Sequence, residues 1–480
     1  MDHIPLYRRL ASHYQDAIAS GTLAPGDRLP SVRTLMERHD VSLSTALQAC
    51  RQLEAEGWLE ARPRSGYFVR PPARAAGLGL QEPNAGPPPD PARYVGMQPR
   101  VSAIIDRGRR SAVRVNFSSA RSTPDLYPGA ALKNAAAHAL RQQPDLLVRV
   151  ASPGGNAAFR AVLAKRALAG GMVLSPDEVL VTQGCIEALN LALRATTQPG
   201  DIVAVESPTF YGLLQVLETL GLRALEIPTS PQTGISLEAL QLAIDSDAEI
   251  KALVVVPHLQ NPLGAIMPDE HKARLVELCH RHGIPLIEDD TYTALIDDGL
   301  PRKALKAWDA VGGVIHCASL HKVLAPGMRL GWLNAGRWQA RVEMLKYAQS
   351  RYNDELAQMA AAAVMASAAY DRHLQRLRGK LREQRQRTAA AIAACFPPGT
   401  RHSQPRGGLA LWVELPQQVA SQELFDRALD AGILIAPGLM FSNSNRYDHF
   451  VRLNCGAPYT VQIDHALREL GRLLQTLLRD

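Results

Sequence analysis

A stretch rich in proline and glycine near the start of the chain divides the sequence into two parts that must fold separately. Residues 71–99 contain eight prolines and four glycines. Such a stretch has too little apolar surface to form a core, and proline stiffens it into an extended spacer. The chain has 480 residues, more than one hydrophobic core usually organises. We therefore predict a domain at residues 1–70, a linker at 71–111 and a second domain at 112–480.

The first domain has the apolar spacing of a small helical unit. Four residues spaced one helical turn apart predict one face of a first helix: Leu6, Leu10, Tyr14 and Ile18. Ser31 and Ser42 can cap two further helices, and short strands are expected at 58–62 and 66–69. Helix, helix, turn, helix and hairpin in this order predict a winged helix-turn-helix.

Charge alone does not select a partner for this domain. Residues 1–70 carry nine arginines and eight acidic residues, whereas residues 71–114 carry seven arginines and three acidic residues. The net charge of the whole chain is +7, which permits a nucleic-acid partner without requiring one. Any DNA contact made by the first domain must therefore come from the local placement of charge.

Four segments of the first domain form a specific pattern in order: Gly26–Arg33, Val41–Ser42, Leu53–Gly57 and Gly66–Val69. Through them, residues 4–70 resemble the GntR family of bacterial regulators. This resemblance implies double-stranded operator DNA as partner, with the helix from Ser42 in the major groove and the wing near the minor groove. We expect these residues to contact DNA: Arg33, Ser42, Leu43, Ser44, Thr45, Gln48, Arg51, Arg62, Arg64 and Gly66.

Two features of this surface leave its base-reading residues open. Leu43 and Leu47 stand where many GntR regulators have arginine. They could pack against thymine methyl groups, or Leu47 could be buried with the residues expected to face inward: Val41, Ala46, Ala49 and Leu53. Arg62 and Arg64 could contact phosphates or could be ordinary solvated surface.

The second domain alternates short apolar runs with helical stretches. The runs that predict buried strands are residues 179–181, 202–205, 252–256 and 285–287. Such alternation is typical of an α/β fold with a mostly parallel sheet and helices on both faces. In such sheets, ligands bind at the carboxyl ends of the strands.

Lys322 is the strongest single candidate for chemistry in this domain. It follows an apolar strand at 314–315 and is accompanied by Ser319, His321 and Arg329. A lysine surrounded by a hydroxyl, an imidazole and a guanidinium is suited to a Schiff base beside a phosphate clamp. This pattern predicts pyridoxal 5′-phosphate (PLP) as the cofactor, with Lys322 as the catalytic lysine.

Other residues that could hold PLP follow predicted strands in the same way. Asp289 has the spacing to Tyr292 needed to pair with the pyridine nitrogen, and Asp290 is the alternative. Asn261 and Tyr292 could reach the ring oxygen, and Phe210 could stack on the ring. The loop of Gly184, Cys185 and Ile186 begins a helix and could bind the phosphate. Arg452 is suited to capture the carboxylate of a substrate or effector.

Taken in order, these residues resemble the pattern of fold-type I aminotransferases over residues 115–475. That resemblance implies a smaller C-terminal subdomain and the PLP-binding roles given above. Two departures concern His321, where relatives usually have serine, and Val150, where many have an aromatic residue. The combination of both parts resembles the MocR subfamily of GntR-type regulators, which implies a head-to-tail homodimer.

The resemblance predicts a PLP-dependent transcription regulator that senses PLP itself or a small amino compound through Lys322. The alternatives are an aminotransferase with an appended DNA-binding domain and a DNA-binding protein that uses PLP only structurally. Six scattered cysteines without a CxxC pair argue against a zinc site and against disulfides. No apolar stretch reaches the length of a membrane span. We expect a cytoplasmic protein without a metal or a membrane partner.

Overall fold

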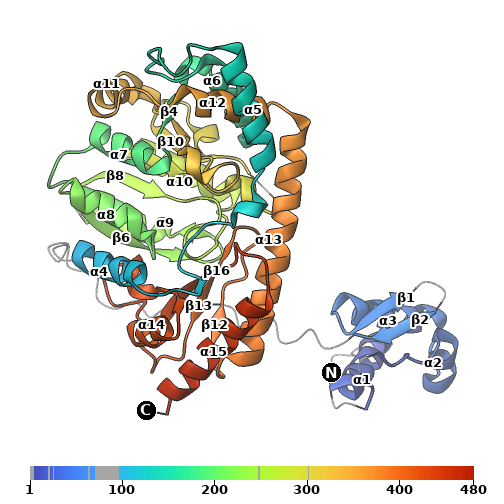
Figure 1. The fold of residues 1–480 in the computed structure, drawn as a ribbon. Coiled ribbons are helices and arrows are strands. Elements are labelled where there is room, and N and C mark those ends of the chain that lie inside the picture. Colours follow the sequence, from blue (N-terminus) through green and yellow to red (C-terminus); the bar gives the residue numbers. More distant parts are fainter. Residues whose placement is uncertain are drawn as a thin grey trace. The chain divides into compact units, whose positions relative to one another are not determined.

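The computed structural model describes residues 5–19, 22–24, 26–62, 65–70, 80, 97–246, 249–300 and 302–479. The chain forms two compact units, Met1–Leu78 and Gly79–Asp480 (Figure 1).

The first unit consists of three helices and a two-stranded antiparallel wing. Its elements are α1 (Leu6–Ala19), α2 (Val32–His39), α3 (Leu43–Ala55), β1 (Leu59–Arg62) and β2 (Gly66–Val69). Ser31 and Ser42 cap α2 and α3 as predicted. Their hydroxyls accept hydrogen bonds from the backbone N–H groups of Thr34 at 3.1 Å and Thr45 at 3.3 Å. The winged helix-turn-helix expected from the sequence is confirmed.

The core of this unit follows the predicted inward face of α3. Ala46, Ala49 and Leu53 are buried, as are Leu10 and Tyr14 of α1. Leu6, the first residue of α1, is 59% exposed, one turn before the buried Leu10.

A helix occupies the end of the segment predicted as a linker. Met97–Arg110 form α4, in which Val101 and Ile104 are buried in the core of the second unit. Arg107 of this helix forms an ion pair with Asp426 at 2.6 Å. The linker predicted at 71–111 therefore ends earlier than expected. Residues 71–79 and 81–96 of that linker lie outside the described residues.

The second unit is built around an eight-stranded sheet of order β4-β11-β10-β9-β8-β5-β6-β7. Its strands are β4 (Leu180–Thr182), β5 (Ile202–Ser207), β6 (Arg223–Ser230), β7 (Gly234–Ile235), β8 (Ile250–Val255), β9 (Leu286–Asp289), β10 (Val314–Ser319) and β11 (Gly331–Asn334). The predicted strands correspond to β4, β5, β8, β9 and β10. Neighbouring strands from β10 to β6 run parallel, whereas β11 and β7 are antiparallel to their neighbours. The sheet is therefore mixed but mostly parallel.

Helices cover both faces of this sheet, as the α/β prediction requires (Figure 1). Val254 of β8 packs into the core under α7 and α8, while Leu253 and Val255 pack toward α9 and α10. The helices are α5 (Gly129–Gln142), α6 (Ala157–Ala167), α7 (Cys185–Thr196), α8 (Tyr211–Thr219), α9 (Leu237–Asp245), α10 (Asp269–Arg281), α11 (Gln339–Gln349), α12 (Glu355–Met365) and α13 (Ala368–Cys395).

A smaller C-terminal subdomain follows α13, as the aminotransferase resemblance implied. It contains a four-stranded sheet of order β12-β13-β16-β15 and a parallel pair of β3 with β14. Its elements are β3 (Val115–Asn116), β12 (Arg401–His402), β13 (Ala410–Glu414), α14 (Ser421–Asp430), β14 (Ile433–Leu434), β15 (Ala436–Pro437), β16 (Phe450–Asn454) and α15 (Val461–Leu477). None of the helices in the described part of the chain is long and apolar enough to span a membrane.

Candidate functional site

The predicted cofactor residues gather at one edge of the large sheet. β4, β5, β8, β9 and β10 all run in the same direction, so their carboxyl ends share this edge. Each of these ends carries one group of candidates, in the order Gly184, Phe210, Asn261, Asp289 and Lys322. This is the edge at which open α/β sheets bind ligands.

Lys322 lies just beyond the end of β10, with its amine turned toward the segment that follows β3. Its Nζ donates a hydrogen bond to the carbonyl oxygen of Ala120 at 2.5 Å and lies 5.7 Å from the ring centroid of Tyr292. Burial, together with the positive charge of Arg452, lowers the pKa of Lys322 to about 8. A lysine with a lowered pKa is an amine prepared for nucleophilic attack on a carbonyl group.

Asp289 is the last residue of β9 and Asp290 follows it, and their side chains contact different groups. Asp289 accepts hydrogen bonds from Cys185 Sγ at 3.2 Å and from the hydroxyl of Thr291 at 2.6 Å. Burial raises the pKa of Asp289, and the hydrogen bonds from these two donors offset part of that rise. Its charge also acts on the amine of Lys322. Of the two carboxylates, Asp289 is therefore the one that acts on the amine of Lys322.

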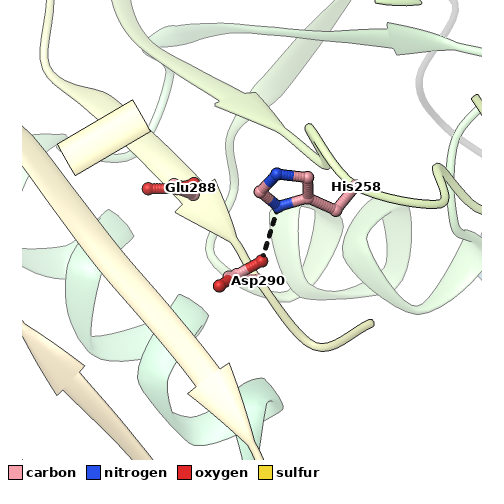
Figure 2. Close-up of side chains that lie close together, drawn as sticks. All are labelled: His258, Glu288 and Asp290. Atoms are coloured by element: carbon pink, nitrogen blue, oxygen red, sulfur yellow. Dashed lines mark hydrogen bonds and ion pairs between the residues drawn. The ribbon is translucent and has the colours of Figure 1, made fainter. Parts of the chain in front are cut away.

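Asp290 belongs instead to a buried network behind the cofactor edge (Figure 2). His258 connects Asp290 with Lys272, since His258 Nδ1 lies 2.9 Å from Asp290 Oδ1 and His258 Nε2 lies 2.8 Å from Lys272 Nζ. Glu288 accepts hydrogen bonds from the backbone N–H groups of two residues and lies 3.2 Å from His316 Nδ1. Burial favours the neutral ring of His316, but the hydrogen bond to Glu288 and the nearby carboxylates raise its pKa.

The ligand-type atoms of His258, Glu288 and Asp290 lie within 4.8 Å of one another, which is close enough to surround a metal ion. The ammonium of Lys272 already contacts His258, and the carboxylate oxygens of Glu288 are taken by N–H donors. A cation placed here would have to displace that ammonium. The contacts therefore favour a network of ion pairs that supports β9 from behind.

Asn261, Tyr292 and Arg452 form a connected row beside Lys322. Asn261 Nδ2 donates to the hydroxyl of Tyr292 at 3.4 Å, and Asn261 Oδ1 accepts from Arg452 Nη1 at 2.8 Å. Arg452 Nη2 donates to the carbonyl oxygen of Ser118 at 2.6 Å. Burial raises the pKa of Tyr292, so that its phenol stays protonated.

Arg452 is a buried cation without a counter-ion. Its side chain is 1% exposed and stacks over Phe441 with 5.0 Å between the guanidinium carbon and the ring centroid. Its Nε has no hydrogen-bond partner, and no ion pair joins it to a carboxylate in the described part of the chain. A buried charge is normally paired with an opposite charge, so the environment of Arg452 is unusual.

The start of α7 and Arg329, which were predicted to hold the phosphate, lie together. Gly184 is the N-cap of α7 with φ +83°, and a Cβ there would lie 3.4 Å from the guanidinium of Arg329. The N–H groups of a first helical turn have no partner within the helix and bind anions. Cys185 turns its thiol to Asp289, and Ile186 is 39% exposed.

Ser319, His321 and Phe210 complete the set of predicted cofactor residues. Ser319 accepts a hydrogen bond from the backbone N–H of His321 at 3.1 Å. Burial and the neighbouring cations lower the pKa of His321 to about 4, and its buried Nδ1 has no partner. Phe210 is the N-cap of α8, with its ring 5.0 Å from that of Tyr211.

The segment from Ser118 to Arg121 also belongs to the site, although it was not predicted from the sequence. Its backbone carbonyls accept hydrogen bonds from Arg452, Lys322 and Asn454. A backbone carbonyl belongs to every residue type, so no side-chain pattern could have identified this segment. The network residues His258 and Lys272 were also missed, because each is isolated in sequence.

The expected DNA-contact residues lie mostly on the surface of the first unit. Arg33 is exposed and pairs with Glu37 at 3.3 Å. Leu43 is 55% exposed, whereas Leu47 is half-buried. Ser44, Gln48 and Arg51 are exposed along α3, and the backbone N–H of Thr45 is used by the Ser42 cap.

The wing presents Arg62 and Gly66 on its surface. Arg62 pairs with Glu60 at 2.7 Å and lies over the ring of Phe68 at 4.3 Å. Gly66 has φ +100°, a conformation that glycine adopts without strain. Arg64, also expected to contact DNA, lies outside the described residues.

Comparison with known proteins supports both parts of the chain. Residues 125–470 match the aminotransferase class I and II family, and residues 6–69 match the gntR family of bacterial regulatory proteins. The uncharacterized HTH-type transcriptional regulator YdcR of Escherichia coli is 37% identical over 98% of this chain and 99% of its own. A second uncharacterized regulator of this bacterium, YjiR, is 34% identical over 97% of this chain and 98% of its own.

The second unit also resembles solved aminotransferases. LysN, an alpha-aminoadipate aminotransferase from Thermus thermophilus, superposes with a TM-score of 0.73 at 27% identity, covering 82% of this chain and all of its own. A Pyrococcus horikoshii kynurenine aminotransferase gives the same TM-score at 24% identity, covering 79% of this chain and 95% of its own. The fold is therefore that of fold-type I aminotransferases, which implies dependence on PLP. With a winged helix and this fold in one chain, and regulators as its full-length relatives, the protein belongs to the MocR subfamily of GntR-type transcription regulators.

Proposed function

We propose that this regulator binds PLP at Lys322 and controls transcription by sensing either PLP itself or a small amine that reacts with it. The observation that carries the proposal is the pair formed by Lys322 and Arg452. One is an amine with a pKa lowered to about 8, and the other is a buried guanidinium without a carboxylate partner in the described part of the chain. Together they offer a reactive amine beside a site for an acid.

The residues around Lys322 fit PLP on each side of the ring. Asp289 offers a buried carboxylate for the pyridine nitrogen, and Asn261 with Tyr292 offers donors for the ring oxygen. Arg329 and the first turn of α7 offer positive charge to the phosphate, and the unpartnered Nδ1 of His321 is free to bond it. The remaining members of the cofactor set are Gly184, Cys185, Ile186, Phe210 and Ser319.

When bound, PLP supplies an aldehyde that condenses with primary amines and a ring that withdraws electrons. Lys322 would hold the cofactor, and Asp289 would keep the proton on the ring nitrogen. Arg452 orients an effector by its acid group, since a guanidinium binds a carboxylate through two parallel hydrogen bonds. An effector amine would displace Lys322, and the free lysine would change the packing at the cofactor edge. Such a switch requires that the effector bind the two states with different affinity.

We propose that the winged helix binds operator DNA through α3 and the wing. The expected contacts are those of Arg33, Ser42, Leu43, Ser44, Thr45, Gln48, Arg51, Arg62, Arg64 and Gly66. The exposed positions of Leu43 and Arg51 on α3 support this arrangement. A protein of this kind acts in the cytoplasm, where bacterial DNA lies.

We also propose a head-to-tail homodimer. Leu147, Val148 and Val150 are 66%, 86% and 76% exposed in one short segment of the second unit. Exposed apolar side chains of this size favour burial against a partner. Val150 also stands where aminotransferases often place an aromatic residue that shapes the partner's site. Sedimentation of the purified protein as a monomer at micromolar concentration would contradict this proposal.

A true aminotransferase is the second candidate, because the residues needed for transamination are all present at the cofactor edge. Continuous turnover of an amino donor with a keto acid would support it. A regulator is expected to complete at most single half-reactions.

The proposal is tested by footprinting the protein on DNA upstream of its own gene, with and without PLP and with candidate amino acids. We expect a protected site whose extent or affinity changes with PLP or an amine. Lys322→Ala should keep the protected site but lose the response, whereas Lys380→Ala, an exposed lysine on α13, should keep both. Protection at no site under any condition, or an unchanged amine response in Lys322→Ala, would refute the proposal.

A further inference from the structure

A second cavity lies on the other face of the large sheet from Asp289. It has a volume of about 200 Å³ and is enclosed by α6, α13 and the segments around the ends of β9 and β10. Lys322, Asp289 and Arg452 are not among the described residues that line it, whereas Ser319 of the cofactor set is. The cavity therefore borders the proposed cofactor pocket without containing Lys322, Asp289 or Arg452.

The wall of this cavity is rich in positive charge. Three arginines line it, Arg166, Arg302 and Arg378, together with His316 and a single carboxylate, Asp290. Arg166 and Arg302 are each 31% exposed and stand toward the surface, whereas Arg378 is 7% exposed and lies deep. Asp290 is already engaged by His258 in the buried network (Figure 2). The lining itself thus has more cations than anions.

Two of the three arginines share a single acidic partner. Arg166 pairs with Asp371 at 2.6 Å, whereas Arg302 and Arg378 share one carboxylate, Asp298, at 3.3 Å and 2.8 Å. Among the described residues, the Nε atoms of Arg302 and Arg378 are buried without a hydrogen-bond partner. Nε2 of His316 also has none there, although it lies 3.8 Å from Asp290 Oδ2. Buried donors without acceptors are rare in folded proteins, and each one calls for a water, an ion or a ligand.

The rest of the wall is apolar and aromatic. Trp332, Tyr370 and Leu374 line the cavity and are all buried. A dry cavity of about 150 Å³ is large enough to hold benzene, so about 200 Å³ accommodates one aromatic ring with a small substituent. The arginines of the wall therefore favour an anionic ligand, and its apolar side chains favour a ligand with an aromatic ring.

We propose that this cavity binds a compact aromatic carboxylic acid, as a second ligand site beyond the PLP pocket. The carboxylate lies toward Arg302 and Arg378, and the ring packs against Trp332. The two pockets share a wall, because Thr291 lines this cavity and donates to Asp289 at 2.6 Å. An acid bound here would therefore contact a residue that positions the cofactor carboxylate.

The test is calorimetric titration of benzoate into the full-length protein saturated with PLP. Arg378→Met removes the deep cation while keeping an apolar side chain, and Arg376→Met, an exposed neighbour on α13, is the matched control. Ala167→Leu fills the cavity from α6 without changing any charge. Arg452→Met separates this site from the carboxylate position of the cofactor pocket.

We expect saturable binding of benzoate that weakens at least about tenfold in Arg378→Met and in Ala167→Leu, since a hydrogen-bonded charge and the cavity space are both required. Binding should persist in Arg376→Met and Arg452→Met. The proposal is overturned if benzoate gives no saturable heat, or if only Arg452→Met abolishes binding. It is also overturned if a folded Ala167→Leu binds benzoate as the wild type does. Retention of the yellow colour of bound PLP in each variant shows that the cofactor proposal is unaffected by these results.

Discussion

The lowered pKa of Lys322 predicts how the attachment of PLP depends on pH. Only the neutral amine attacks an aldehyde, so the rate should rise with pH up to the pKa and then level off. At pH 7, a pKa of about 8 leaves roughly one amine in ten neutral, whereas an ordinary value of 10.5 would leave roughly one in three thousand. The protein environment therefore increases the reactive form of Lys322 by about 300-fold.

The perturbation that tests this reasoning is Arg452→Met. The positive charge of Arg452 lowers the pKa of Lys322, although burial is the larger cause. Removal of that charge should move the midpoint of the pH profile upward while keeping it below 10.5, and should slow attachment at pH 7. Arg376→Met, an exposed cation on α13, should leave the midpoint unchanged.

The assay is stopped-flow absorbance of cofactor-free protein mixed with PLP between pH 6 and pH 10. A wild-type rate that climbs about tenfold per pH unit without levelling off would refute the reasoning, because it would mean an ordinary lysine. An unchanged midpoint in Arg452→Met would show that this guanidinium does not act on the amine.

Three further predictions concern other parts of the molecule. Asp289→Asn should weaken retention of PLP in dialysis while the cofactor-free protein keeps its stability. Asp290→Asn should instead lower the free energy of unfolding in urea by about 3 kcal/mol, because it breaks a buried ion-pair network; equal effects in both assays would contradict the different roles of the two carboxylates. Burial raises the pKa of Glu206 from 4.5 to about 8. The free energy of unfolding of the wild type should therefore fall as the pH rises from 4.5 to 8, by at most about 1.4 kcal/mol per pH unit. The melting temperature of Glu206→Gln should depend less on pH than that of the wild type. Parallel curves of melting temperature against pH for the two proteins would contradict this prediction. Arg51→Ala should reduce the slope of log affinity against log salt by about 1, while Leu43→Ala should leave the slope unchanged and alter the preference among operator sequences.

Local signals in the sequence were sufficient where a single residue type determines the geometry. Ser31 and Ser42 predicted the starts of α2 and α3, because a hydroxyl at an N-cap satisfies free N–H groups. The buried strands beside Asp289 and Lys322 were visible as apolar runs bounded by polar residues. These runs also placed the cofactor candidates at one edge of the sheet.

The remaining features depended on tertiary contacts that leave little trace in the sequence. The helix α4 lies in a proline-containing and basic segment, and it gains burial of Val101 and Ile104 from the second unit. The choice between Asp289 and Asp290 required the strand register, since a shift of one residue exchanges the two faces. The carbonyl oxygens of Ser118 and Ala120 contribute through the path of the backbone alone.

The solitary guanidinium of Arg452 links the choice of ligand to the thermal stability of the protein. Among the described residues, the buried charge of Arg452 contacts two carbonyl-type oxygens and an aromatic face but no carboxylate, which destabilises the ligand-free fold. An acid that arrives there removes this cost, and a ligand that binds only the folded state raises the melting temperature by mass action. Among candidate amines of equal size, those bearing a carboxylate should therefore protect the protein against heat more than their amide or ester counterparts.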